Sequence, residues 1–165
     1  MGTAELDLVL EAWHRHTRIL GNLAGLATPE AAQLRSSADG STIAGHLCHI
    51  HETRYGWLGE VSKEHQAKLG EVFREVDGSW VPIEDLDEIK RQLAISAEAV
   101  PAAVRSLVDA GQTRVGPYSH PTFFLQHMLW HEGYHFGLIT LALRNGGLEP
   151  SEEWEEENVW GIWRS

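Results

Sequence analysis

Two histidines four positions apart, His131 and His135, are the part of the sequence best suited to chemistry. In an α-helix this spacing places both side chains on one face, so the two imidazole rings can reach a single metal ion. The pair also continues a row formed by Phe124, Met128 and Leu138, at the three- and four-residue steps of a helix that packs against others. Buried imidazoles need partners for their ring nitrogens, and a shared divalent ion supplies one to each ring. The pattern therefore predicts a metal site on this helix.

A third ligand is expected from an earlier helix, which carries three neighbouring histidines. His46 and His49 lie on one apolar face of that segment, so either can reach toward the helix of His131. His51 is rotated by roughly 200° from His49, because an α-helix has about 3.6 residues per turn. We expect His51 to face solvent. The residues alone leave His46 and His49 as alternatives for the third position.

Three further side chains are candidates for contact with the ligand rings. His127 stands four residues before His131, as an alternative ligand or a partner of a ligand ring. Glu52 follows His49 by about one turn, and Glu132 is next to His131. Carboxylates in such positions can orient an imidazole or move a proton. Solvated surface charge is an equally good interpretation of both glutamates.

The segment from His131 to His135 also matches the H-E-x-x-H pattern of zinc metalloproteases, in which the glutamate, here Glu132, is the base. A zinc hydrolase of this type is therefore an alternative function. Against it, Gly133 weakens the helix, and no predicted strand is available to hold an extended peptide beside the metal. A di-iron centre is disfavoured, because no second acidic half-motif faces the first.

Four segments show the periodicity of amphipathic helices, and none shows the sustained alternation of a strand. Asp39 or Ser41 is expected to cap the second helix, and Pro101 to kink or split the third. Pro121 suits the start of the fourth helix, and the two glycines after Asn145 suit its end. These features predict an all-α fold, a four-helix bundle forming one domain over residues 1–165, with helices at about 6–23, 43–61, 86–107 and 121–145.

Charge and composition exclude several classes of protein. The chain has 13 Lys and Arg against 24 Asp and Glu, a formal net charge of −11, so binding to a nucleic-acid backbone is disfavoured. No apolar run approaches the roughly 20 residues that cross a bilayer. Several glutamates gather in an acidic, tryptophan-containing tail at about residues 149–165, which we expect to be solvated.

The single cysteine and the N-terminal residues bear on the cellular compartment. Cys48 is the only cysteine, which precludes an internal disulfide, and it is expected to be a small core residue. The first residues lack the basic and apolar stretches of a signal peptide, so we expect a cytoplasmic protein. Trp57 and Trp130 are expected to fill the core.

Three segments resemble the DinB-like superfamily. WHEGYHFGLI at residues 130–139, followed by LRNGG at 143–147, is similar to the last core helix of these proteins, which carries a His-x-x-x-His pair. GHLCHI at residues 45–50 is similar to their second helix, which carries a third ligand, and WGIWR at 160–164 resembles a frequent ending. The matches cover most of the chain in order, and the motif of the last helix is the specific one.

The resemblance implies a bundle of the up-down-down-up type with a metal site between its second and fourth helices. It assigns His49, His131 and His135 as ligands of one divalent ion, often zinc, nickel or iron, in a pocket open to solvent. It also implies a homodimer. Some relatives are thiol-dependent transferases or isomerases that use a low-molecular-weight thiol.

Such a ligand set would favour catalysis over a structural role. Three neutral imidazoles leave a divalent ion its full charge and at least one open position. An ion of this kind lowers the pKa of bound water toward about 7 and deprotonates a coordinated thiol. We therefore expect a metal-dependent transferase or hydrolase that activates a thiol or water toward a small substrate. A metal-binding protein without catalysis is the alternative.

Overall fold

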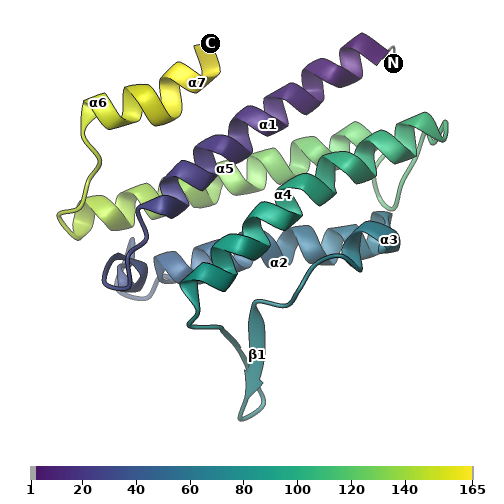
Figure 1. Cartoon of the computed structure of the whole chain (residues 1–165). Helices are drawn as coiled ribbons and strands as arrows, with labels where there is room; N and C mark the ends of the chain where they lie inside the picture. The colour runs from purple at the N-terminus through teal and green to yellow at the C-terminus, as the bar shows by residue number, and fades with distance from the viewer. Residues whose placement is uncertain (1–2, 165) are drawn as a thin grey trace.

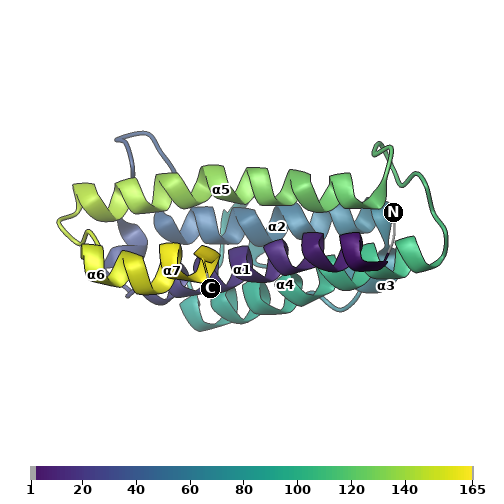
Figure 2. The ribbon, with the colours of Figure 1, turned by 90° about the horizontal axis from the view of Figure 1, so that it is seen from above.

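The computed structural model describes residues 3–164, and most of them are helical. Four long helices, α1 (Thr3–Gly25), α2 (Ile43–Val61), α4 (Leu86–Asp109) and α5 (Pro121–Asn145), lie alongside one another (Figures 1 and 2). Each packs against at least two of the others. The prediction of a helical fold is thus confirmed, and the four predicted segments coincide with the four long helices. Among residues 3–164, none of the helices combines the length and the apolar character that spanning a bilayer requires.

Short elements fill the connections. They are η1 (Ala31–Gln33), α3 (Lys63–Gln66), β1 (Phe73–Val76) and β2 (Ser79–Pro82). The two strands form an antiparallel hairpin that projects from one side of the helices (Figure 1). Asp77 and Gly78 make its turn, both with positive φ (50° and 78°). Asp-Gly is a strong sequence signal for such a turn, so the expectation of no strand was wrong at a place where the sequence carried the information.

Local signals set the starts of the helices that carry the histidines. The Thr42 hydroxyl accepts a hydrogen bond from the Gly45 amide at 3.0 Å and caps α2, a role expected of Asp39 or Ser41. Pro121 occupies the first turn of α5, where its missing N–H costs nothing. At the other end Asn145 is the last helical residue and Gly147 has φ 72°, as the glycine pair predicted.

Of the two expected effects of Pro101, a kink or a split, the split does not occur: α4 runs without interruption from Leu86 to Asp109. A proline removes the N–H that would bond the carbonyl four residues earlier, which here is that of Ala97. The indole Nε1 of Trp13, a fully buried residue of α1, donates a hydrogen bond to this carbonyl at 2.7 Å. The side chain of one helix thus compensates for the proline of another.

The C-terminal segment is ordered against α1, where a solvated tail was expected. It comprises α6 (Glu152–Glu155), the π-helical turn η2 (Glu156–Trp160) and α7 (Gly161–Arg164), and lies on the side of the helices opposite the hairpin (Figure 1). Val159 and Ile162 are buried with Ile19 of α1 in a small apolar cluster. Its acidic side chains are mostly exposed, as expected. The segment itself is helical and packs on α1, which was not expected.

Candidate metal centre

Three histidine rings from two helices converge on one point. His49 comes from α2, and His131 and His135 come from α5. The Nε2 atom of His131 lies 3.2 Å from that of His49 and 3.2 Å from that of His135. One nitrogen from each ring falls within 4.8 Å of the others, a grouping able to hold a metal ion. His135 is buried, His131 half-buried and His49 exposed, so the cluster opens to solvent on the α2 side.

His46 contacts the cluster from behind. Its Nδ1 lies 3.0 Å from Nδ1 of His135, the nitrogen of that ring that does not face His131. One of these nitrogens carries the shared proton, and the contact fixes how the His135 ring is turned. Among the described residues, Nε2 of His46 and Nδ1 of His131 are buried without a hydrogen-bond partner. His46 therefore lies behind His135, and the group of converging ligand atoms includes His49 and not His46.

The surroundings of the cluster keep its rings uncharged. Burial lowers the pKa of His46, His49, His131 and His135. For His135 burial and the neighbouring rings of His131 and His49 lower the pKa to about 4. Metal ligation requires neutral imidazole. The four rings are thus in the required protonation state at neutral pH.

The donor set fits a divalent transition metal. Three imidazole nitrogens suit zinc, nickel, copper and iron, whereas magnesium and calcium prefer oxygen ligands. Over residues 3–164, no carboxylate belongs to the group of converging ligand atoms. A metal ion held by these three histidines alone would keep a coordination position open toward the exposed side, as metal sites in enzymes do.

Glu132 does not join the cluster, and its assignment as a base or as a partner of a ligand ring needs correction. Its carboxylate is fully buried and receives hydrogen bonds from Arg54 Nε at 2.7 Å and Nη2 at 2.6 Å, and from His16 Nε2 at 2.8 Å. Burial alone would raise its pKa, but Arg54 and His16 lower it. A carboxylate held in this way is not free to act on a substrate, so the structure does not favour the zinc hydrolase interpretation of this motif.

Arg54 connects this carboxylate to the rest of the core and was missed in the sequence. Its Nη1 donates to the Leu93 carbonyl at 2.9 Å and to the Ser96 hydroxyl at 3.0 Å, and its guanidinium stacks on Trp13 at 5.1 Å. A signal was present, since Arg54 falls at helical spacing in the apolar stripe of Leu47, Ile50 and Leu58. A charged residue in a core stripe predicts a buried partner of opposite charge.

Three other residues named in the sequence analysis lie outside the group of converging ligand atoms. His51 is fully buried, with its ring nitrogens 3.0 Å from the Gln92 carbonyl and 2.8 Å from the Gly70 carbonyl, so the expectation of exposure was wrong. His127 pairs with the Tyr118 hydroxyl at 2.7 Å. The buried Cys48 has a pKa raised by burial to about 12, as suits an inert core thiol.

The two tryptophans singled out from the sequence differ in burial. Trp57 packs on the core from a partly buried position, whereas Trp130 is 75 % exposed, against expectation.

A shallow pocket of about 370 Å³ adjoins the exposed side of the cluster. Its lining combines His49 with acidic, small and aromatic side chains: Glu52, Thr53, Gly56, Trp57 and Glu60. A small molecule in this pocket would lie against the ring of His49. Glu52 is the only predicted carboxylate candidate that lines it.

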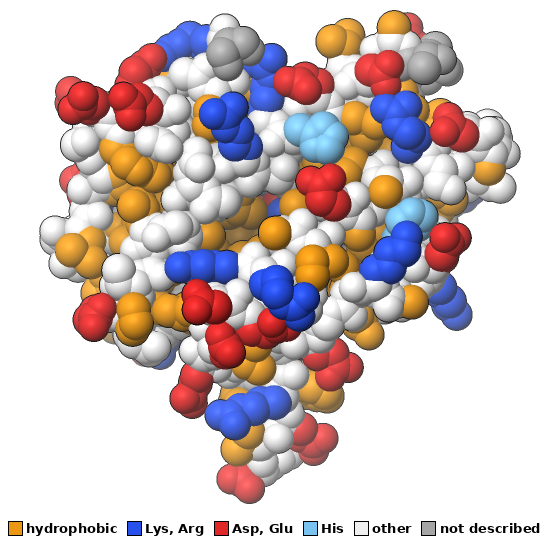
Figure 3. Space-filling view, viewed as in Figure 1, with side chains coloured by type: hydrophobic (Ala, Val, Ile, Leu, Met, Phe, Trp, Pro, Cys, Tyr) orange, Lys and Arg blue, Asp and Glu red, His pale blue; other side chains and the backbone are white. Residues whose placement is uncertain are grey.

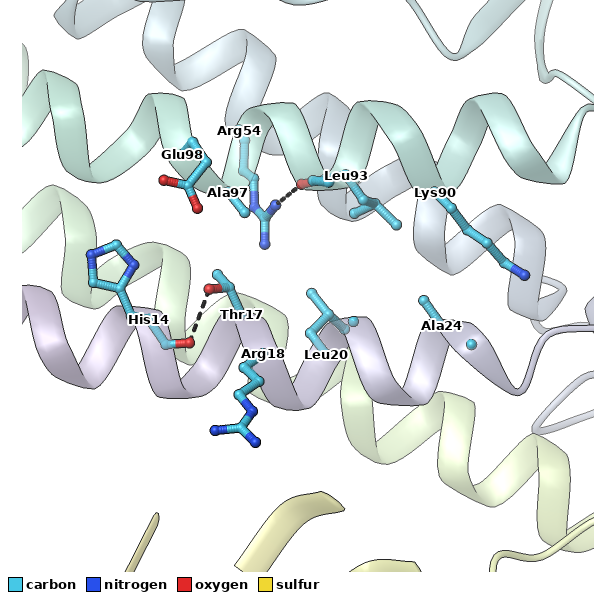
Figure 4. A pocket seen from close by; sticks show the side chains of 13 residues that line it. His14, Thr17, Arg18, Leu20, Ala24, Arg54, Lys90, Leu93, Ala97 and Glu98 are labelled. Carbon is cyan, nitrogen blue, oxygen red and sulfur yellow. Dashed lines mark hydrogen bonds between the residues drawn. The ribbon is translucent and has the colours of Figure 1, made fainter. Parts of the chain in front are cut away.

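A second cavity, also about 370 Å³, lies between α1 and α4 and includes none of the three histidines. Figure 3 shows a hollow on this face of the molecule, bordered by side chains of both charges. Figure 4 shows Arg54 reaching from α2 toward the space between the two helices, with its bond to the Leu93 carbonyl. The cavity thus meets the buried ion pair and is separate from the histidine cluster.

Comparison with known proteins gives one finding. The family model of the DinB superfamily matches residues 10–139, well over half of the chain, including α2 and both histidines of α5. Searches of curated proteins and of solved structures returned no match. On the extent of the family match, the chain belongs to the DinB superfamily.

Proposed function

We propose that His49, His131 and His135 bind one divalent metal ion, and that the protein is an enzyme that activates a thiol or water toward a small substrate. The observation that carries the proposal is the convergence of three ring nitrogens with an exposed side facing a pocket. Nε2 of His131 lies 3.2 Å from Nε2 of both other rings, and one ring nitrogen cannot donate a proton to one neighbour and accept one from the other at the same time. A shared ion satisfies these nitrogens together.

The side chains of the protein would bind the ion, orient its ligand rings and close one side of the site. A divalent ion at this site supplies Lewis acidity, which lowers the pKa of a coordinated water or thiol. His46 holds the His135 ring in the orientation that directs its Nε2 into the cluster. Glu52, with a pKa raised by burial and by Glu71, lies in the pocket beside His49, where it can accept a proton from a substrate. The buried side of the cluster is closed by His135 and His46.

Zinc, nickel and iron all fit three imidazoles, and we propose one of them as the resident ion. The proposed co-substrate is a low-molecular-weight thiol, since the chain's own cysteine is buried and has a raised pKa. The pocket beside His49 is of a size for a small molecule.

Elemental analysis of protein purified without an affinity tag tests metal binding. We expect one ion per chain, lost in His131→Ala and His135→Ala and retained in the matched control His127→Ala, because His127 is engaged with Tyr118. Absence of metal from the parent, or equal loss in the control, would contradict the site. Thiol transfer to small electrophiles, measured with and without a chelator, then tests catalysis; metal binding without turnover would leave a metal-binding protein.

We also propose that α1, α2, α4 and α5 form a four-helix bundle of the superfamily's type and that two copies associate through α5. Four large apolar side chains of α5 are exposed, at successive steps of seven, four and seven residues that keep them on one side of the helix: Phe123, Trp130, Tyr134 and Leu141. Exposed apolar stripes of this kind are typical of protein interfaces.

A further inference from the structure

A pocket of about 440 Å³ lies where α2 meets the β1–β2 hairpin. Its lining consists of two carboxylates and three aromatic side chains, and it includes no basic and no aliphatic residue: Glu52, Tyr55, Glu71, Phe73 and Trp80. A lining restricted to these two kinds of side chain is chemically selective. Aromatic faces and carboxylates both attract positive charge.

The fold explains how these side chains come together. Glu52 and Tyr55 are three residues apart on α2 and therefore neighbours on its surface. In the hairpin, Phe73 pairs with Pro82 and Glu75 with Trp80. Side chains two residues apart share a face of a strand, so Phe73 and Trp80 lie on the same face of the hairpin.

Within the described part of the chain, no basic side chain pairs with the carboxylates of this pocket. Among residues 3–164 neither Glu52 nor Glu71 forms an ion pair, although the chain has eight ion pairs elsewhere in that range. Glu71 adds to the effect of burial in raising the pKa of Glu52, which shows that the two charges repel each other. A cation placed between them would relieve this repulsion and would meet the ring faces at the same time.

We propose that this pocket binds a small organic cation, one with an alkylammonium or quaternary ammonium group. An inorganic cation would gain little from the three rings, whereas methyl or methylene groups around a positive nitrogen pack on them while the charge stays near the carboxylates. Aromatic side chains with nearby carboxylates are the general means of recognising such groups.

The position of the pocket links it to the histidine cluster. Glu52 lines both this pocket and the one that contains His49. A molecule held here by its cationic group would extend along α2 toward the three rings. The substrate of the enzyme would then be an organic cation. This identification of the substrate rests on the proposed function, whereas the binding of a cation in the pocket is independent of it.

Calorimetric titration with choline and benzyltrimethylammonium tests the site, with 3,3-dimethylbutan-1-ol as the uncharged analogue of choline. We expect both cations to bind and the neutral analogue to bind at least about tenfold more weakly, since a single favourable cation–π or charge contact is worth on the order of tenfold. Failure of both cations to bind at millimolar concentration, or equal binding of the neutral analogue, would overturn the proposal.

Matched variants locate the binding. Glu52→Gln, Glu71→Gln and Trp80→Ala should each weaken binding of the cations severalfold to about tenfold. Glu152→Gln removes the same charge from α6, outside the pocket, and should leave affinity unchanged. An equal effect of Glu152→Gln would mean attraction to the acidic protein as a whole and would refute the site. Circular dichroism verifies that each variant is folded.

A variant without the histidine cluster separates this proposal from the proposed function. His131→Ala should still bind the cations, because His131 does not line the pocket. Metal binding without cation binding would refute the pocket alone. Cation binding by a protein that never binds metal would refute the proposed function and would still support the cation site.

Discussion

Arg54 of α2 and Glu132 of α5 form an ion pair that is closed to water, with side-chain exposures of 1 % and 0 %. Two parallel hydrogen bonds join them. Further hydrogen bonds and a ring contact reach two other helices: His16 and Trp13 on α1, and Leu93 and Ser96 on α4. The pair therefore ties all four long helices together at the level of His131. It explains the acidic residue of the H-E-x-x-H pattern as a structural one.

Replacing Glu132 with alanine should lower the free energy of unfolding by about 3–5 kcal/mol, because it leaves a buried guanidinium without its counter-charge. Urea denaturation measures this loss. The control is Asp7→Ala, which breaks the exposed pair of Arg105 and Asp7 and should cost no more than about 1 kcal/mol. Equal losses in the two variants would show that the buried pair has no special role.

Trp13→Phe should lower the free energy of unfolding by about 1–3 kcal/mol beyond any loss of packing, since it leaves the Ala97 carbonyl without a partner. A double-mutant cycle isolates this contribution. In a Pro101→Ala background the residue at position 101 regains an N–H for that carbonyl, so the cost of Trp13→Phe should be smaller there. The same cost in both backgrounds would contradict the account of how α4 accommodates its proline.

The sequence predicts those parts of the fold that depend on neighbouring residues. The bounds of α5 follow from Pro121 and from the glycine pair after Asn145, both of which act within one turn. The continuity of α4 through Pro101 cannot be predicted from neighbouring residues, because it depends on a hydrogen bond from Trp13, 84 positions before Ala97 in the chain. The burial of His51 is missed for the same reason, since its partners lie near residues 70 and 92.

For the candidate site, the sequence does not determine how α2 is rotated about its axis. Periodicity alone places His131 and His135 on the packed face of α5, where the structure has them. His46 and His49 are three residues apart on one face of α2, and only the rotation of α2 against α5 decides which of them faces His131 and which lies behind His135. Rotation is a tertiary property, set by the packing of all four helices. Resemblance to a family can indicate this rotation, whereas residue spacing within α2 cannot.

His46→Ala should weaken metal affinity about 10- to 100-fold while leaving one ion per chain, because residues that orient a ligand ring contribute to this extent without binding the ion. Competition with a chromogenic chelator measures the affinity. His127→Ala, on the same helix as two of the candidate ligands but paired with Tyr118, should leave it unchanged. Complete loss of metal in His46→Ala would instead make His46 a ligand.

Trp130→Glu should convert a dimer into a monomer, because it places a charge in the centre of the exposed stripe on α5. Light scattering coupled to size-exclusion chromatography gives the mass. Leu8→Glu is the matched control, since Leu8 is 72 % exposed on α1 and lies outside the stripe. A monomeric parent, or a dimer that tolerates Trp130→Glu, would contradict association through this face.

The metal-free protein should lose stability as the pH falls below about 6.5. The folded state lowers the pKa of His135 from its usual value of 6.5 to about 4 and lowers those of His46, His49 and His131 in the same direction, mainly through burial. Between these pH values the unfolded chain therefore takes up protons that the folded chain does not. Linkage then requires the free energy of unfolding to decrease as the pH falls, and to level off with respect to His135 below about pH 4.

Urea denaturation in the presence of a chelator, at several pH values between 6.5 and 4.5, tests this prediction in a range above the usual pKa of a glutamate. Glu132, whose pKa is lowered, adds its own loss only at still lower pH. His135→Gln removes the ring with the largest shift, so its stability should fall less steeply over the same interval. A parent whose stability falls no more steeply than that of His135→Gln would mean that the His135 ring takes up its proton in the folded state, and the neutral ring that the metal site requires would be refuted with it.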